Sequence, residues 1–125
     1  MKFGIDRLCE DLVVLGFNNE FVEDPQKNVF VIVQKYSIEL GRFAGRVIDL
    51  GLMVPPNYPQ GICSCIHVRS IPHLLDIKDT VQNVRNITES SLGPEWRYWS
   101  RNFGWAEERS TRRLMSQINE IFLHA

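Results

Sequence analysis

The sequence predicts a single α+β domain over residues 1–125, in which one helix precedes an antiparallel sheet and another helix follows it. Three observations favour this class: a helical period near each end, strand-like segments between them, and links between those strands that are too short for crossover helices. A length of 125 residues suits one compact core. We therefore expect a helix, a meander of strands, a long loop and a final helix.

The first expected helix covers about residues 4–16. Its apolar side chains recur at the spacing of one helix face, and Gly16 is a typical helix stop. The apolar stripe consists of Ile5, Leu8, Cys9 and Leu12. Because free cysteines are commonly buried, Cys9 is expected in the core.

Three strands are expected next. Residues 29–36 are β-branched and aromatic, as in a central strand, whereas residues 46–54 and 62–68 alternate between two faces. The stretch PPNYPQG at 55–61 contains three prolines that stop both strand and helix, so it is expected to be a rigid, extended turn. The third strand places Ile62, Ser64, Ile66 and Val68 opposite Cys63, Cys65 and His67.

The rest of the chain divides into a loop and a helix. Residues 70–98 show no sustained period and are expected to form a long irregular loop, a type of segment that is often functional in a compact domain. The final helix is expected over about 106–123, with its arginines in solvent. Its apolar stripe is Leu114, Met115, Ile118, Ile121 and Phe122, and the solvated residues are Arg109, Arg112 and Arg113.

Charge and cysteine content narrow the function classes. Fourteen Lys and Arg against fifteen Asp and Glu give a net charge of −1, which provides no strong attraction for nucleic acid or an anionic membrane. Cys63 and Cys65 are too close along the chain for a disulfide, which favours reduced thiols. The charged N-terminal stretch is neither a signal peptide nor a membrane span, so we expect a cytoplasmic protein.

No metal or cofactor site is expected. Cys63, Cys65 and His67 share a strand face, but alternate side chains on a strand stand roughly 6.5–7 Å apart, too far for tetrahedral zinc. A strand interior is also a poor place for a nucleophilic cysteine. The glycines form no phosphate-binding pattern, so no cofactor is implied.

An aromatic cluster lies between residues 96 and 105, interleaved with Arg97 and Arg101. It is best explained as a plug that closes a small core, and the alternative is a surface that stacks on single-stranded nucleic acid. Its members are Trp96, Tyr98, Trp99, Phe103 and Trp105.

The order of elements and four motifs resemble the ubiquitin-conjugating enzyme (UBC) superfamily. Pro55-Pro56-Asn57-Tyr58-Pro59 matches the P-x-x-Y-P turn of that family, and Trp99-Ser100 matches its Trp-Ser pair. With the usual spacings, Ser91-Leu92 falls on the catalytic Cys-Leu and Gln82-Asn83-Val84 on the P-N-I of the H-P-N motif. Residues 93–101, GPEWRYWSR, also resemble the divergent prokaryotic branch, but the expected cysteine is absent.

The resemblance implies a UBC-like conjugating transferase. Such an enzyme takes a ubiquitin-like modifier from an activating enzyme in a bacterial-type conjugation pathway and passes it to an amine on an acceptor protein. Here Ser91 could carry the modifier as an oxyester, and the resemblance implies that Asn83 steadies the loop and the developing oxyanion. The candidate bases are Glu89, Asp79 and His73.

Two other readings remain open. The first is an inactive UBC-like scaffold that binds the modifier or its activating enzyme, and the second is a small nucleic-acid-binding domain. In the family, the first helix meets the activating enzyme, which implies a polar contact surface on its exposed face. Here that surface would consist of Lys2, Asp6, Arg7 and Glu10.

Overall fold

The computed structural model describes residues 3–62, 65–82, 85–100 and 109–125. In chain order the described elements are α1 (Gly4–Val14), β1 (Asn19–Glu23), β2 (Val29–Ser37), β3 (Val47–Met53), β4 (Cys65–Arg69), the 3₁₀ helix η1 (Ile77–Asp79), β5 (Asn86–Ser90), β6 (Gly93–Ser100) and α2 (Thr111–Leu123).

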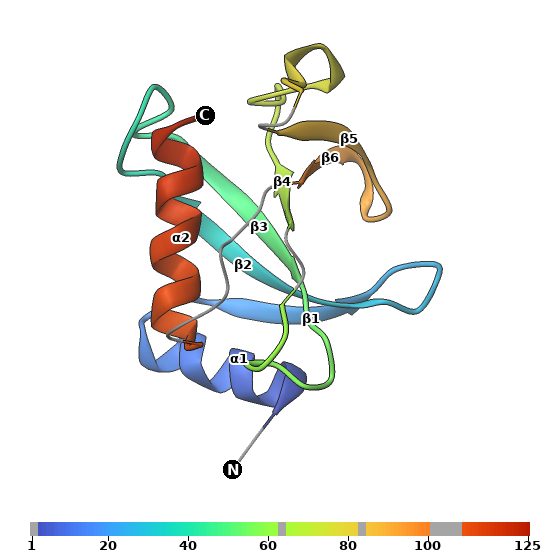
Figure 1. The fold of residues 1–125 in the computed structure, drawn as a ribbon, viewed down its shortest axis with the longest axis vertical. Helices are drawn as coiled ribbons and strands as arrows, with labels where there is room; N and C mark the ends of the chain where they lie inside the picture. The colour runs from blue at the N-terminus through green and yellow to red at the C-terminus, as the bar shows by residue number, and fades with distance from the viewer. Residues whose placement is uncertain (1–2, 63–64, 83–84, 101–108) are drawn as a thin grey trace.

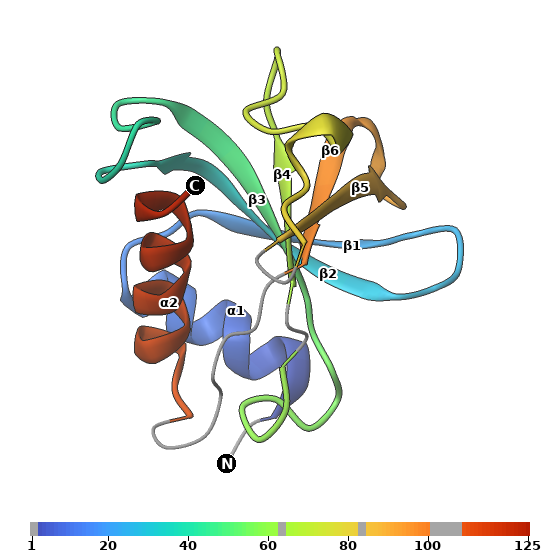
Figure 2. The same cartoon turned by 45° about the horizontal axis from the view of Figure 1, so that its top comes forward.

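The described strands form one sheet in the order β1-β2-β3-β4-β6-β5, and every neighbouring pair is antiparallel. Both helices lie on the same side of this sheet (Figures 1 and 2). This confirms the prediction of an α+β domain in which the strands of an antiparallel sheet follow one helix and precede another along the chain.

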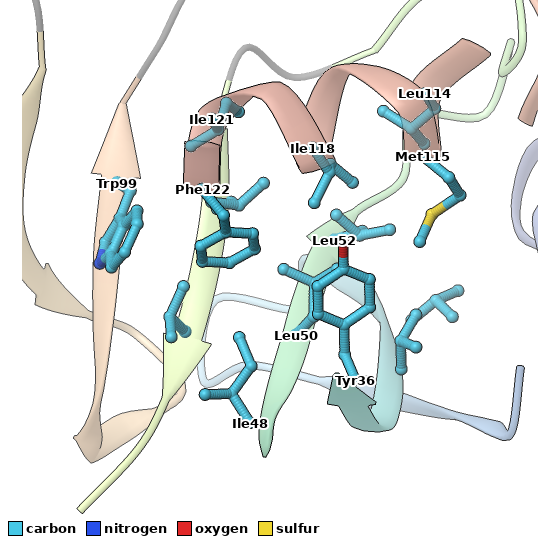
Figure 3. Close-up of a cluster of buried hydrophobic side chains, with 14 of the residues drawn as sticks. Tyr36, Ile48, Leu50, Leu52, Trp99, Leu114, Met115, Ile118, Ile121 and Phe122 are labelled. Atoms are coloured by element: carbon cyan, nitrogen blue, oxygen red, sulfur yellow. The ribbon is translucent and has the colours of Figure 1, made fainter. Parts of the chain in front are cut away.

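The main core lies between the helices and the sheet (Figure 3). The stripe predicted on the final helix is buried throughout, and Leu8 and Leu12 of α1 are fully buried. Cys9 is half-buried and packs against this core, and the three arginines predicted to be solvated are exposed. From the sheet, the core receives Val31, Val33, Ile48, Leu50, Leu52, Ile66, Val68, Ile87 and Trp99.

A second, smaller cluster covers the opposite face of the sheet, which we call the outer face. Phe30, Ile32 and Trp96 are buried there, and Leu92 packs against them. Because side chains alternate along a strand, β6 places Trp99 in the main core and Trp96 in the outer cluster. The predicted aromatic plug is therefore divided between the two faces, and Phe103 and Trp105 lie outside the described residues.

The prediction of an irregular loop over residues 70–98 is wrong, because β5 and most of β6 lie inside that stretch. The edge strand β5 buries a single apolar residue, Ile87, so it shows no alternating pattern. In β6 the two buried rings, Trp96 and Trp99, are three residues apart on opposite faces, which hides the two-residue period.

The sequence analysis also did not predict the other edge strand, β1. The final helix, α2, begins later than expected. In β1 none of the side chains is fully buried, so its sequence NEFVE has no strand signature. The structure begins α2 at Thr111, where the Ser110 hydroxyl accepts a hydrogen bond from the Arg113 backbone N–H at 3.1 Å. The start predicted near residue 106 lies outside the described residues.

The proline-rich turn joins the two helices through a network of hydrogen bonds. The Tyr58 hydroxyl lies 2.6 Å from Thr111 Oγ1, which donates to Asp11 Oδ2 at 2.7 Å. Arg7 Nε donates to the same carboxylate oxygen at 2.9 Å, and the Gly4 N–H donates to the Tyr58 carbonyl at 2.9 Å. Burial raises the pKa of Tyr58 to about 12, so this hydroxyl stays protonated and donates to Thr111.

Replacing Thr111 by Val tests this network. The variant keeps the side-chain shape but removes the hydroxyl that accepts from Tyr58 and donates to Asp11, so the loss of two hydrogen bonds should lower the free energy of unfolding by about 1–3 kcal/mol. Urea unfolding measures the change. Ser116→Ala, at an exposed position of α2, is the matched control and should change stability by less than about 0.5 kcal/mol.

Candidate active site at two hairpin turns

Ser91 lies in the turn between β5 and β6. Ser90 and Gly93 are paired across the hairpin, so Ser91 and Leu92 alone form the connection. Gly93 has φ of +135°, a conformation that side-chain-bearing residues rarely adopt, which explains a glycine at this corner. The turn leaves Ser91 exposed, whereas Leu92 points into the outer cluster.

The Ser91 hydroxyl donates a hydrogen bond to Asp24 Oδ2 at 2.8 Å. Asp24 ends the β1 side of the β1–β2 turn and is 7% exposed. Its carboxylate also accepts from the Gln26 N–H at 2.9 Å, from the Asn28 N–H at 2.8 Å and from Asn28 Nδ2 at 3.0 Å. Burial alone raises the pKa of Asp24, but these bonds from Asn28, Ser91 and Gln26 outweigh it and hold the pKa below its ordinary value. Asp24 is therefore ionised at neutral pH.

Curvature of the sheet brings these two turns together. The strands β1 and β5 are at opposite edges of the sheet, yet the β5–β6 turn reaches the β1–β2 turn (Figure 1). Gly51 in the middle of β3 makes this possible because it has no side chain on the outer face. A Cβ atom there would lie 3.0 Å from Leu92 Cδ1 and 3.2 Å from Trp96 Cζ3.

A second hydroxyl lies beside Ser91. Ser90 Oγ is 2.7 Å from His67 Nδ1 and accepts the Leu92 N–H at 3.1 Å. His67 is 4% exposed, with Phe30 and Tyr98 packed edge-on against its ring. Burial lowers the pKa of His67 to about 4, against a smaller opposing effect of Asp24, so the imidazole is neutral at neutral pH. The pair fixes the conformation of the turn that carries Ser91.

Ser91 opens into a cleft of about 440 Å³ between the two turns. Asp24 and Ser91 lie on its walls, and Ile32 and Trp96 of the outer cluster also line it. Arg69 also lines the cleft. Its guanidinium donates to Asp49, and its Cζ atom lies 5.3 Å from the centroid of the Trp96 ring. The cleft thus offers an apolar surface, an exposed hydroxyl and a fixed cation beside one another.

The other site residues predicted from the sequence are placed as follows. Asn83 lies outside the described residues. Glu89 is exposed on β5 and is paired in register with Arg97, while the carboxylate bonded to Ser91 is that of Asp24. Asp79 accepts the Asp76 N–H in the cap of η1, and together with His73 it lines a different cleft of about 630 Å³.

Asp24 was not found by the sequence analysis. Asp24 and Asn28 enclose a proline-containing turn, a composition that predicts a side-chain-capped turn and nothing more. No local signal connects Asp24 with Ser91, which is 67 positions further along the chain. Glu89 was a candidate base because it directly precedes the two serines. The carboxylate that contacts Ser91 is instead that of Asp24.

The structure also describes part of the residues considered for nucleic-acid binding, for a cysteine nucleophile and for a metal site. Trp96 and Trp99 are 7% and 1% exposed, and Arg97 donates to Asp76 at 2.7 Å, so among the described residues these two tryptophans are not open for stacking on bases. Cys65 is buried, and Cys63 lies outside the described residues. Within the described ranges, no group of three or more His, Cys, Asp or Glu side chains is placed to hold a metal ion.

On α1, the polar face implied by the resemblance is partly described. Asp6 and Glu10 are exposed, Arg7 is half-buried against Asp11, and Lys2 lies outside the described residues. In the part of the chain that the structure describes, neither helix is long and apolar enough to cross a membrane.

A hydroxyl oriented by an ionised carboxylate at the mouth of a cleft defines a class of site suited to nucleophilic acyl transfer. The family model of Prokaryotic E2 family E matches residues 9–122, and the chain belongs to this family. This confirms the predicted resemblance at the level of a prokaryotic E2 family and supports an E2-like function in general. No curated protein and no solved structure gives a significant match.

Replacing Gly51 by Ala tests how the site is assembled. The new methyl group would press on Leu92, His67 and Trp96, so we expect a loss of about 1–3 kcal/mol in the free energy of unfolding. Amide exchange at Leu92, whose N–H is bonded to Ser90, should become faster. Ser37→Ala at the exposed end of β2 is the control. Unchanged amide exchange at Leu92 would show that the outer face accommodates a methyl group at residue 51 without displacing the turn.

The buried His67 predicts a pH dependence of stability. The folded-state pKa of about 4 lies below the ordinary value of 6.5, so between these values only the unfolded chain binds the proton. Stability should be unaffected above pH 6.5 and should fall by roughly 3 kcal/mol as the pH drops to 4, at about 1.4 kcal/mol per unit. Urea unfolding at a series of pH values measures this, and His67→Gln should lack the drop. An imidazole NMR titration near 6.5 in the folded protein would contradict the prediction.

Proposed function

We propose that the chain is an acyl carrier of the E2 kind, which holds a ubiquitin-like modifier as an oxyester on Ser91. The observation that carries the proposal is the exposed Ser91 hydroxyl, bonded at 2.8 Å to a buried, ionised carboxylate at the mouth of a cleft. Membership in a prokaryotic E2 family supplies the reaction class, and the position that resembles the catalytic cysteine of the superfamily is this serine.

The transfer involves two exchanges at one acyl carbon. Ser91 Oγ forms a bond to the C-terminal carbonyl carbon of the modifier, the bond to the thiol of the activating enzyme breaks, and the serine proton ends on the released thiolate. An amine of the acceptor protein then attacks the oxyester, an amide forms, and Ser91 regains a proton. The partners in this proposal are the modifier, its activating enzyme and the acceptor protein.

Asn83 and Glu89 keep their proposed roles around this step. Asn83 would steady the loop and donate to the oxyanion, an interaction whose loss typically costs about 10²–10³ in rate. Glu89 is exposed two positions from Ser91 and stays a candidate general base.

The second candidate function is an inactive E2-like scaffold. It is favoured by the other bonds of Asp24, because a carboxylate that already accepts from Gln26 and Asn28 serves a structural purpose in the β1–β2 turn. On this reading the Ser91 bond only holds two hairpins together. The two functions differ in whether a covalent adduct forms.

Intact-protein mass spectrometry decides between them. The chain is incubated with a ubiquitin-like modifier, its activating enzyme and ATP, and is compared with Ser91→Ala and with a variant that replaces Cys9, Cys63 and Cys65. We expect a modifier-sized adduct that survives thiol reductant and cysteine removal but is lost in Ser91→Ala. Ser37→Ala, which removes an exposed hydroxyl at the end of β2, is the matched control and should retain the adduct, and Ser90→Ala is run as well to test the neighbouring hydroxyl.

Other outcomes identify other functions. An adduct lost only with the cysteines would mean a thioester carrier, and an adduct lost only in Ser90→Ala would move the nucleophile to the His67-bonded serine. The absence of any adduct, with binding to the activating enzyme intact, would identify a scaffold.

A further inference from the structure

We propose that Asp24 is the general base for Ser91 and that its carboxylate makes this site selective for a hydroxyl nucleophile over a thiol. The inference rests on the proposed function and deepens it, because it names a catalytic residue on a distant hairpin and gives a reason for serine at this position.

The geometry places Asp24 as a fixed proton acceptor. Its Oδ2 is 2.8 Å from Ser91 Oγ, within the range required of a base and its nucleophile. The bonds from Gln26 and from the backbone and side chain of Asn28 hold the carboxylate in place independently of Ser91. Because the serine proton is already directed at Oδ2, the lone pairs of Oγ are free to face an acyl carbon in the cleft.

The base changes the proton path but not the balance of the reaction. As Ser91 Oγ bonds to the acyl carbon of the activating enzyme's thioester, its proton passes to Asp24 Oδ2. The C–S bond breaks, and the proton is delivered to the leaving thiolate. In the second exchange, Asp24 accepts a proton from the attacking amine and returns it to Ser91 Oγ when the C–O bond breaks. Asp24 therefore finishes each turnover ionised.

The same carboxylate would oppose a thiol. A serine hydroxyl stays protonated until the attack, so a neighbouring anion assists by accepting the proton. A cysteine reacts as its thiolate, and an ionised carboxylate in contact with it disfavours that second negative charge. The low pKa of Asp24 means that this negative charge is present at neutral pH. The site thus assists one nucleophile and hinders the other.

The neighbouring His67 does not replace Asp24 in this role. Its Nδ1 is bonded to Ser90, whose oxygen also accepts the Leu92 N–H, so the imidazole and Ser90 together fix the turn. The bond that Ser91 itself makes is to Asp24.

A two-by-two comparison of Asp24→Asn with Ser91→Cys tests the proposal. In the serine protein, Asp24→Asn should lower the rate of adduct formation by about 10², the low end of the contribution of a general base, because a carboxylate with a lowered pKa is a weak base. In the Ser91→Cys background, the same Asp24→Asn change should leave the rate of thioester formation unchanged or raise it. Damage to the fold would lower both rates, so the difference in sign separates chemistry from structure.

A second measurement requires the Ser91→Cys variant alone. Alkylation by iodoacetamide is followed against pH on the peptide that contains residue 91, which separates it from the native cysteines. We expect the thiol to titrate above its ordinary pKa of about 8.5 because of the Asp24 charge. A titration below that value would overturn the proposal.

The outcomes separate this inference from the function on which it rests. If no Ser91 adduct forms in the unmodified chain, the proposed function fails. If the adduct forms and Asp24→Asn leaves its rate unchanged, the function stands and the role of Asp24 is overturned. Equal losses in the serine and cysteine backgrounds would also overturn it, because Asp24 would then act only through the fold.

Discussion

The curvature of the sheet over Gly51 is the constraint on which the site depends. A flat sheet in this strand order would hold the β1–β2 and β5–β6 turns at opposite edges, and the Ser91–Asp24 bond could not form. Because Gly51 of β3 has no side chain, Leu92 and Trp96 pack directly over it. This packing places the β5–β6 hairpin over the outer face of the sheet. The position of Ser91 is therefore a result of packing, not of the turn alone.

The two faces of the sheet bury different kinds of side chain. The face that packs against the helices is apolar and forms the main core. On the outer face, a few large apolar side chains lie beside His67, Ser90 and Asp24. The strands β4 and β6 contribute to both, since neighbouring residues such as Ile66 and His67 face opposite ways. Polar groups on the outer side are thus held by the same strands that form the core.

The sequence predicted what depends on local periodicity and missed what depends on distant contacts. The apolar stripes of both helices and the faces of β3 were predicted because each element buries one continuous face. The edge strands β1 and β5 have little to bury, so they carry no pattern. Ser91 was chosen as a candidate through a spacing resemblance. Asp24 could not be found, because only the folded sheet brings residues 67 positions apart together.

The choice of a hydroxyl at the hairpin tip has a consequence for oxidative conditions. An exposed thiolate is converted by peroxide to sulfenic acid and then to irreversible products, which stops any carrier that depends on it. Ser91 has no such chemistry. Of the two cysteines that the structure describes, Cys65 is buried, and burial together with Asp6 raises the pKa of the half-buried Cys9 thiol. In a carrier built in this way, the loaded form would be an oxyester, with no catalytic thiolate of its own for peroxide to oxidise.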